Sequence, residues 1–439
     1  MIFVSFAIIV ECVRNLTIYP SSLMAPAPSS TIPTASLRWT ADTGAIRFGW
    51  VNVVVAAVVM LATLPGRTQG LGLITEPLLR DLQLDRIAYA NLNLWATLLG
   101  AAICLPIGRV FDRVGLRWTT AALSLMLALV VWRMSELTGG VTALFVLVLL
   151  TRAVGQSALS VASITAVGKS FGSRVGMAMG VYSVLLSVFF AAAFVAIGAS
   201  VRTGGWRRAW LHVAVGLAFV VTPTVVLFMQ EPGAPQVARP SSPGTSTGLT
   251  LTAALRTPAF WVFAGATSLF GLVSSGLGLF NEAVLAERGF NQQTYHTFLA
   301  ASAIMALVGQ FGCGWLTLRW SMQRLLGLAM FLYALALVAL PFIVTLPQLW
   351  IFAALIGLSG GMITVMFFAI WRRFGSGHLG RIQGAAQMLT VLASAVGPLV
   401  FAKCAAVTGS YTPILWMLAP CVFSVGLAAL RVSVPDERA

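Results

Sequence analysis

The feature that most constrains this chain is the recurrence of nearly uncharged apolar runs, each about as long as a bilayer is thick. Crossing about 30 Å of hydrocarbon takes roughly 20 apolar residues in a helix. Of the 439 residues, 59% are hydrophobic and 9% are charged, whereas soluble domains hold roughly 45 to 50% apolar residues. The sequence therefore predicts an all-α polytopic membrane protein whose core is a helix bundle in lipid.

The predicted spans form two sets of six. They lie near residues 48–74, 88–109, 117–135, 141–168, 176–199, 207–229, and then near 258–283, 293–317, 322–344, 347–371, 382–404 and 411–431. A stretch rich in Pro, Gly, Ser and Thr separates the sets and is typical of a linker. The predicted domains are an N-terminal tail 1–45, a six-helix bundle 46–230, a linker 231–257, a second bundle 258–431 and a C-terminal tail 432–439.

The N-terminal tail has the composition of a disordered segment, because residues 20–40 are rich in Pro, Ser and Thr. The apolar start "MIFVSFAIIV" is too short to span and lacks the basic region of a secretory signal. Met24 is a second candidate for the translation start.

Charge predicts the orientation and the partners. The net charge is +15, and the basic residues collect on one side if both termini face the cytoplasm, as the positive-inside rule requires. Along the sequence these basic residues are scattered between the apolar runs, and only two of them are lysines. This distribution excludes the single basic face of a nucleic-acid-binding protein. We expect a monomeric, multi-pass protein of the cell (inner or plasma) membrane, with the lipid bilayer and a small-molecule substrate as its partners.

Motifs for enzyme chemistry are missing from the sequence. The five cysteines form no CxxC pair and fall mostly in apolar runs, where they predict helix packing rather than disulfides or metal sites. There is no GxxxxGK nucleotide loop. We therefore predict that the chain is not an enzyme, has no catalytic residues, binds no metal or cofactor, and draws energy from gradients.

Two segments, one in each half, resemble each other. "FGSRVGMAMG" at 171–180 and "FGSGHLGRIQG" at 374–384 both begin Phe-Gly-Ser and open a helix with Gly-x-x-x-Gly. Independent small-residue packing is the alternative explanation. We favour a repeat related by an axis along the membrane normal, and so predict twelve transmembrane helices as two parallel six-helix pseudo-repeats.

The segment "GRVFDRVGLR" forms the predicted cytoplasmic loop between spans 2 and 3. Gly108 and Gly115 suit a tight turn, and the basic residues Arg113 and Arg117 are at least topology anchors. Asp112 can also pair with the N-terminus of helix 11, where the helix dipole favours an anion. That helix opens near Gly380 and Gly384, so these seven positions, with Asp112 at the centre, predict a gate that closes the inner side: Gly108, Asp112, Arg113, Gly115, Arg117, Gly380 and Gly384.

These features resemble the major facilitator superfamily of secondary transporters. Its loop signature, Gly-x-x-x-Asp-Arg-x-Gly followed by basic residues, is similar to the segment from Gly108 to Arg117, although Leu116 stands where the family often has a basic residue. The helix-4 segment "LLTRAVGQSA" is similar to a second signature. "GWVNVVVAAVV" and "ASAVGPLVFAKCAAVTGSY" look closer to the monocarboxylate and oxalate/formate branch. The resemblance implies the major facilitator fold and alternating access.

Polar groups inside the spans are the candidate site. Embedded charges are expensive and usually face the bundle interior. Arg152, with Gln156 one turn on, either binds an anionic substrate or is satisfied by neighbouring carbonyls. In "TLPGRTQG", Pro65 and Gly66 can break helix 1 beside Arg67 and Gln69, although Arg67 can alternatively snorkel to the interface. Further candidates for substrate contact are Asn281 and Gln387.

Glu282 is the main candidate for coupling transport to protons, because no span carries an acidic residue near its centre. His212 and His296 are weaker candidates. The sequence therefore predicts a secondary active or facilitative transporter moving a small solute, in particular an organic anion such as a monocarboxylate, by alternating access. The alternatives are an efflux carrier for amphipathic compounds, lined by residues such as Met177, Phe189, Phe270 and Met366, and a non-transporting membrane receptor on a transporter fold.

Overall fold

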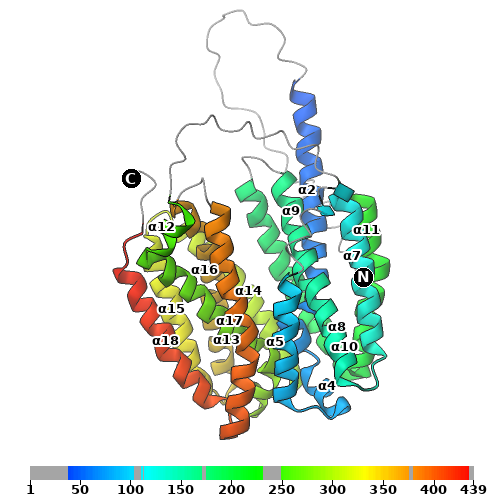
Figure 1. The fold of residues 1–439 in the computed structure, drawn as a ribbon, viewed down its shortest axis with the longest axis vertical. Helices are drawn as coiled ribbons and strands as arrows, with labels where there is room; N and C mark the ends of the chain where they lie inside the picture. Colours follow the sequence, from blue (N-terminus) through cyan, green and yellow to red (C-terminus); the bar gives the residue numbers. More distant parts are fainter. Residues whose placement is uncertain are drawn as a thin grey trace, which may run out of the picture. The chain divides into compact units, whose positions relative to one another are not determined.

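The computed structural model describes residues 38–102, 110–111, 113–170, 175–230, 249–374 and 379–434. Residues 47–439 form one compact unit, and the residues up to Ile46 form another. All contacts described below lie within residues 47–439. Every regular element in the described ranges is a helix (Figure 1).

The first half of the chain supplies the elements up to α11. They are α2 (Arg38–Ala62), η1 (Leu64–Gly66), α3 (Thr68–Gly72), α4 (Thr75–Leu82), α5 (Arg86–Ala102), α7 (Leu116–Ser135), α8 (Val141–Leu150), η2 (Thr151–Leu159), α9 (Ser160–Ser170), α10 (Val175–Gly216), η3 (Leu217–Val221) and α11 (Thr222–Phe228).

The second half supplies the elements from α12 onward. They are α12 (Leu251–Leu255), α13 (Pro258–Ala286), α14 (Gln292–Leu316), α15 (Met322–Ala339), η4 (Leu340–Phe342), α16 (Leu346–Ala369), η5 (Ile370–Phe374), α17 (Leu379–Thr408) and α18 (Thr412–Arg431).

The predicted number of passes is confirmed. In the described ranges, 10 helices are long and apolar enough to cross a membrane. One of them, Met177–Phe228, has 52 residues and breaks at Gly205, whose φ of 77° suits glycine, so it makes two passes. The 17-residue α5 makes one more. Helix 1 begins at Arg38, earlier than predicted, because its polar first turns continue the apolar helix.

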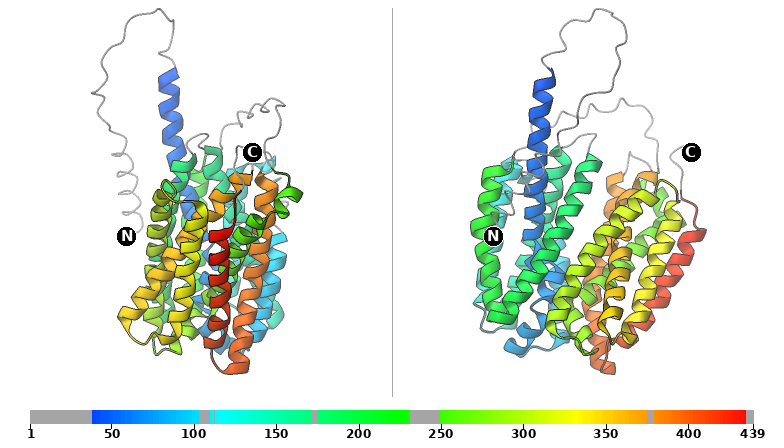
Figure 2. Two further views of the ribbon diagram at one scale, coloured as in Figure 1. Left: turned by 90° about the vertical axis from the view of Figure 1, so that its left-hand side faces the viewer. Right: turned by 180° about the vertical axis from the view of Figure 1, so that it is seen from behind.

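The helices form two groups (Figures 1 and 2). Helices α5 to α11 gather on one side and α13 to α18 on the other. The largest contacts between the groups are those of α3 with α13, α10 with α14, and α5 with α17, and α4 also contacts α13. The core at these contacts is apolar, as expected for a bundle held by close packing in lipid.

Glycines set the close approach of α14 and α16. A Cβ added at Gly361 would lie 2.0 Å from the Ala306 carbonyl oxygen, and one at Gly309 would lie 2.4 Å from the Leu358 carbonyl oxygen. Both obstacles are backbone atoms, which cannot rotate away. Small residues at this interface therefore fix the distance between the two helices.

We predict that Gly361→Val lowers the free energy of unfolding by about 1 to 3 kcal/mol, the usual cost of overpacking. The control is Gly312→Val on α14, because a Cβ at Gly312 meets nothing within 4 Å. Denaturant unfolding in detergent micelles measures both variants. Equal stability of the two variants would contradict the packing described here.

Candidate functional site

A cavity of about 1930 Å³ lies between the two groups of helices. Its wall is mostly apolar and aromatic, with scattered hydroxyl and amide groups. The aromatic and methionine side chains are Met60, Met179, Tyr182, Phe190, Phe194, Phe270, Phe298, Phe311, Trp315 and Met322. The charged side chains among the described lining residues are Arg67 and Arg373, and none of those residues is acidic.

The cavity reaches one end of the bundle. We call this end the linker side, because α11 ends there at Phe228 and α12 begins there at Leu251. Figure 1 shows α12 at this end and α4 at the other. The lining runs from Gln69 and Asn281 to Arg373 and Gln383, which lie where α16 ends and α17 begins. The site is therefore connected to the linker side.

The end opposite the linker is closed by contacts between the two groups. A Cβ at Gly72 would lie 2.0 Å from the Gly278 carbonyl oxygen, so α3 and α13 touch through their backbones. Arg202 on α10 lies 2.9 Å from the Nδ1 atom of His296 on α14. These contacts separate the cavity from that end.

Arg67 lies in the predicted break of helix 1, which the structure confirms. Leu64–Gly66 form a 3₁₀ turn, and Arg67 is extended (φ −87°, ψ 152°). Its Nε donates to Thr63 Oγ1 (2.7 Å) and its Nη2 to Ser160 Oγ (3.3 Å). The guanidinium lies 5.5 Å from the Phe190 ring centroid, a cation–π contact. Every recorded partner is neutral, so this half-buried cation faces the cavity without a compensating carboxylate in the described part of the chain.

Arg152 lies behind the cavity wall and is only 2% exposed. It belongs to a π-helical turn, η2, a local widening often found at functional positions. Its guanidinium donates to Thr68 Oγ1 (3.0 Å), Gln156 Oε1 (2.6 Å) and Asn93 Oδ1 (3.0 Å). Side-chain oxygens thus stand where one of the predicted alternatives for Arg152 expects carbonyls, whereas its Nε is buried and has no hydrogen-bond partner in the described ranges. Gln156 accepts a hydrogen bond from Arg152 and is not among the residues that line the cavity.

The two predicted residues of α13 are adjacent in sequence, but only one of them lines the cavity. Asn281 lines the cavity together with Gln69. Glu282 is not among the lining residues; it accepts a hydrogen bond from Gln292 Nε2 (3.1 Å), and its Oε2 is buried with no hydrogen-bond partner in the described ranges. The carboxylate therefore stands near the closed end, outside the cavity.

The predicted residues of α17 also separate. Gln387 is exposed and outside the lining, whereas Gln383, one turn earlier, lines the cavity. Phe270 lines it as well, but Phe189 and Met366 do not, and Met177 is 64% exposed.

The predicted inner gate is described only in part. Gly108 and Asp112 lie outside the described residues, as does the side-chain environment of Gly380. Gly115 has φ 94° and precedes α7, which confirms the tight turn that glycine permits. Arg113 is exposed, and Arg117 donates to the Val226 carbonyl, which ties α7 to α11. A Cβ at Gly384 meets nothing within 4 Å.

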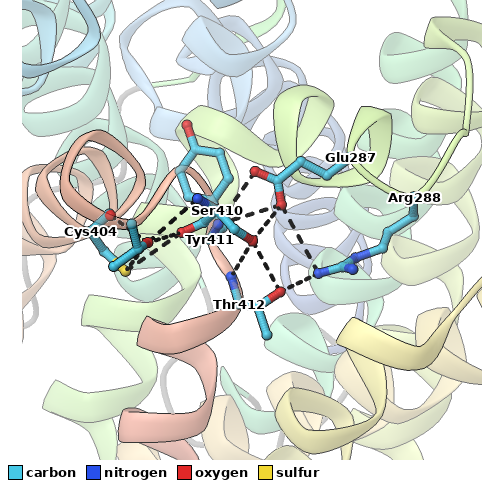
Figure 3. A network of polar contacts seen from close by, with 7 residues as sticks. Glu287, Arg288, Cys404, Ser410, Tyr411 and Thr412 are labelled. Atoms are coloured by element: carbon cyan, nitrogen blue, oxygen red, sulfur yellow. Dashed lines mark hydrogen bonds and ion pairs between the residues drawn. The ribbon is translucent and has the colours of Figure 1, made fainter.

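A polar network surrounds the turn between α17 and α18 at the closed end (Figure 3). Glu287 accepts from Ser410 Oγ (3.1 Å) and from the Tyr411 amide (3.3 Å), and Arg288 donates to Thr412. In the first half, the Trp206 indole donates to Asp81 (2.7 Å) and, together with Arg207, holds the pKa of that carboxyl below its ordinary value. Both networks brace the closed end within their own half.

Sequence reasoning missed the residues that act across helices. Nothing in the sequence distinguishes Asn93, Thr68, Ser160 and Phe190 from other polar or aromatic residues of the spans, since their roles depend on helices far away in sequence. In the described residues no group of three or more His, Cys, Asp or Glu comes together as a metal site would require.

Comparisons with known proteins agree on one architecture. The sequence model described as Major Facilitator Superfamily matches residues 55–398. Two solved structures of a bacterial homolog to the human lysosomal transporter Spinster are similar: the inward-facing unoccupied one (TM-score 0.63, 15% identity, 88% of this chain and 92% of that one) and the inward-facing occupied one (0.55, 16%, 86% and 91%). The nucleoside transporter NupG is also similar (0.69, 13%, 87% and 98%). No curated protein matches the chain at a significant level.

We predict that Arg152→Met lowers the free energy of unfolding by about 1 to 3 kcal/mol, because Asn93 and Gln156 lose a buried donor. Chemical denaturation in detergent measures the effect. The control is Arg133→Met, since the Arg133 side chain is 66% exposed and contacts only the exposed groups Glu136 and Trp132 in the described structure. An Arg152→Met protein as stable as the control would contradict the supporting role.

Proposed function

Because the chain belongs to the major facilitator superfamily and is a membrane transporter of small solutes, we propose that its substrate is a small organic anion with an apolar body, such as a monocarboxylate. The observation that carries this proposal is Arg67: a cation in a cavity whose described lining holds no acidic side chain. A substrate anion would supply the missing charge.

The electrostatics favour an anion over other solutes. A guanidinium in a poorly solvated site gains most from a charged acceptor, since charge-assisted hydrogen bonds are about twice as strong as neutral ones. Thr63 and Ser160 already orient Arg67 from the side of the protein. A cationic substrate would meet repulsion there and would find no carboxylate in the described wall.

The rest of the wall suits an apolar body. Phe190, Phe270, Phe298 and Trp315 offer ring surfaces, and the hydroxyls of Ser187 and Ser274 offer single hydrogen bonds. Ligand sites typically combine such an apolar lining with a few oriented polar groups. This lining also favours the second candidate, export of amphipathic compounds, because it would admit larger apolar bodies.

Arg152 would act on substrate through its neighbours. It holds Thr68, which stands between the lining residues Arg67 and Gln69. In this proposal Arg67, Gln69 and Asn281 contact substrate, Arg152 and Gln156 keep the helix-1 break in place, and Gln387 joins the site in another conformation.

The transport cycle would use the two halves as rigid bodies that rock around the cavity. The positive-inside rule assigns the linker side, with both termini, to the cytoplasm of a plasma membrane. The closed end would open outward, and Asp112 would then close the inner end against the start of α17, where Gly380 and Gly384 lie.

Coupling would use Glu282. It lies beside the contacts that close the outer end, and one of its carboxylate oxygens is buried without a partner in the described structure. A carboxylate in such a place can take up and release a proton during the cycle.

We predict that Arg67→Gln weakens the binding of benzoate roughly 10- to 100-fold, the loss expected for one hydrogen-bonded charge. Benzamide and benzylammonium share the ring and differ in charge, and we expect both to bind weakly to either protein. Equilibrium binding of the radiolabelled compounds in detergent measures this.

Two further variants sharpen the Arg67 test. Arg67→Lys should retain part of the benzoate affinity, and the exposed Arg133→Gln should retain all of it. Tight benzoate binding by Arg67→Gln, or preferred binding of benzylammonium by the native chain, would overturn the proposal of an anion site at Arg67.

We predict that Glu282→Gln abolishes the stimulation of uptake by a pH gradient and leaves solute exchange across proteoliposomes intact, because exchange needs no net proton movement. The matched control is Glu136→Gln, whose carboxylate is 49% exposed. Undiminished gradient-driven uptake by Glu282→Gln would exclude this carboxylate as the coupling group.

A further inference from the structure

The contact between Arg202 and His296 joins the two halves at the closed end. His296 on α14 is only 1% exposed. A Cβ added at Gly198 on α10 would lie 2.3 Å from the imidazole ring, so the absence of a side chain there lets the ring pack against α10. Arg202, one turn further along α10, reaches the same ring from the side.

Hydrogen-bond chemistry sets the protonation state that this contact needs. A guanidinium has donors only, and Nη1 of Arg202 lies 2.9 Å from Nδ1 of His296. Nδ1 must therefore be the acceptor, which makes the ring neutral with its proton on Nε2. That Nε2 is buried and has no hydrogen-bond partner in the described structure.

A proton on Nδ1 would turn the attraction between the ring and Arg202 into repulsion. It would remove the only acceptor that Arg202 has on the ring, and it would place a positive charge on the buried ring, beside the guanidinium of the exposed Arg202. Histidine is the side chain whose charge ordinarily changes between about pH 5 and 8. One of the contacts that hold the closed end thus exists in one protonation state only.

The other charged and titratable groups near His296 do not replace that acceptor. Tyr295 on the same helix lies 5.1 Å away between ring centroids. From α13, Glu282 accepts from Gln292, one turn before His296, through one oxygen only; its other oxygen is buried and bonds neither His296 nor Arg202 in the described ranges. On α10, His212 bonds Ser200 and is exposed. Helix α16 carries no titratable side chain.

We propose that His296 is a proton-binding site whose occupation at Nδ1 breaks the contact with Arg202 and opens the transporter on the side opposite the linker. When the halves separate, the imidazole becomes hydrated and binds a proton more readily. By linkage, acidification therefore shifts the population toward the open state. This response to pH changes the equilibrium between the closed and open states, and it requires neither the proposed substrate nor Glu282.

The experiment measures the distance across the closed end as pH changes. Spin labels are placed at Thr138→Cys, between α7 and α8, and at Val344→Cys, before α16, in a variant whose native cysteines are alanine. Both positions are exposed and belong to different halves. Double electron–electron resonance in lipid nanodiscs, without substrate, gives the distance distribution. Lowering the pH from about 8 to about 5 should shift it to longer distances.

Variants assign the response to the proposed group. His296→Gln should abolish the shift and stay closed, because the amide oxygen still accepts from Arg202 and cannot be protonated. Arg202→Gln should reduce the shift, since no cation remains to repel the charged ring and only the burial of that ring still opposes its protonation. His212→Gln and Glu282→Gln should keep the shift, and the latter separates this inference from the coupling proposal.

Three results would overturn the inference: a native protein whose distances do not change with pH, a full shift in His296→Gln, or a shift that disappears only in Glu282→Gln. If His296→Gln does not fold, the Arg202→Gln protein decides, because a full shift there would show that the repulsion between the two groups is not the cause.

Discussion

The hydrocarbon interior offers no water to a polar group, and the rest of the structure follows from this constraint. Backbone groups must bond within helices, so the chain leaves helical geometry only where other protein groups compensate. The break at Leu64–Gly66 is such a place: Thr63, Ser160 and Phe190 surround Arg67 there. The same constraint makes an uncompensated cation at the cavity wall a strong indicator of the charge of the substrate.

The two embedded arginines show how the surroundings of a charge decide its role. Arg152 is enclosed by Thr68, Asn93 and Gln156, and the acceptors of its hydrogen bonds all belong to the first half. Arg67 instead lines the cavity between the two halves. In our proposal Arg152 holds the broken helix in position and Arg67 binds the substrate. At the closed end too, the surroundings decide what a charge does, because the hydrogen bond from Arg202 requires a neutral His296.

The sequence alone predicted the number of passes, the break at Pro65 and the turn at Gly115, because apolar runs, proline and glycine act locally. It also predicted that Arg67 is a candidate for the site. It could not place side chains on a face of the bundle: Gln387 is exposed while Gln383 lines the cavity, and Arg152 lies behind the wall. The position of a residue along its apolar run gives its depth in the membrane, but its neighbours come from other helices. Arg202 and His296 are 94 residues apart, and nothing in either local segment announces the contact.

The charge selectivity of transport tests the central claim most directly. Purified native protein in proteoliposomes would be given radiolabelled solutes that share one apolar skeleton and carry a carboxylate, an amide or an ammonium group, with protein-free liposomes as the background. If Arg67 binds an anionic substrate, uptake of the carboxylate alone will be saturable, and unlabelled carboxylates will compete with it. Saturable uptake of the ammonium compound, or equal uptake of all three, would contradict it.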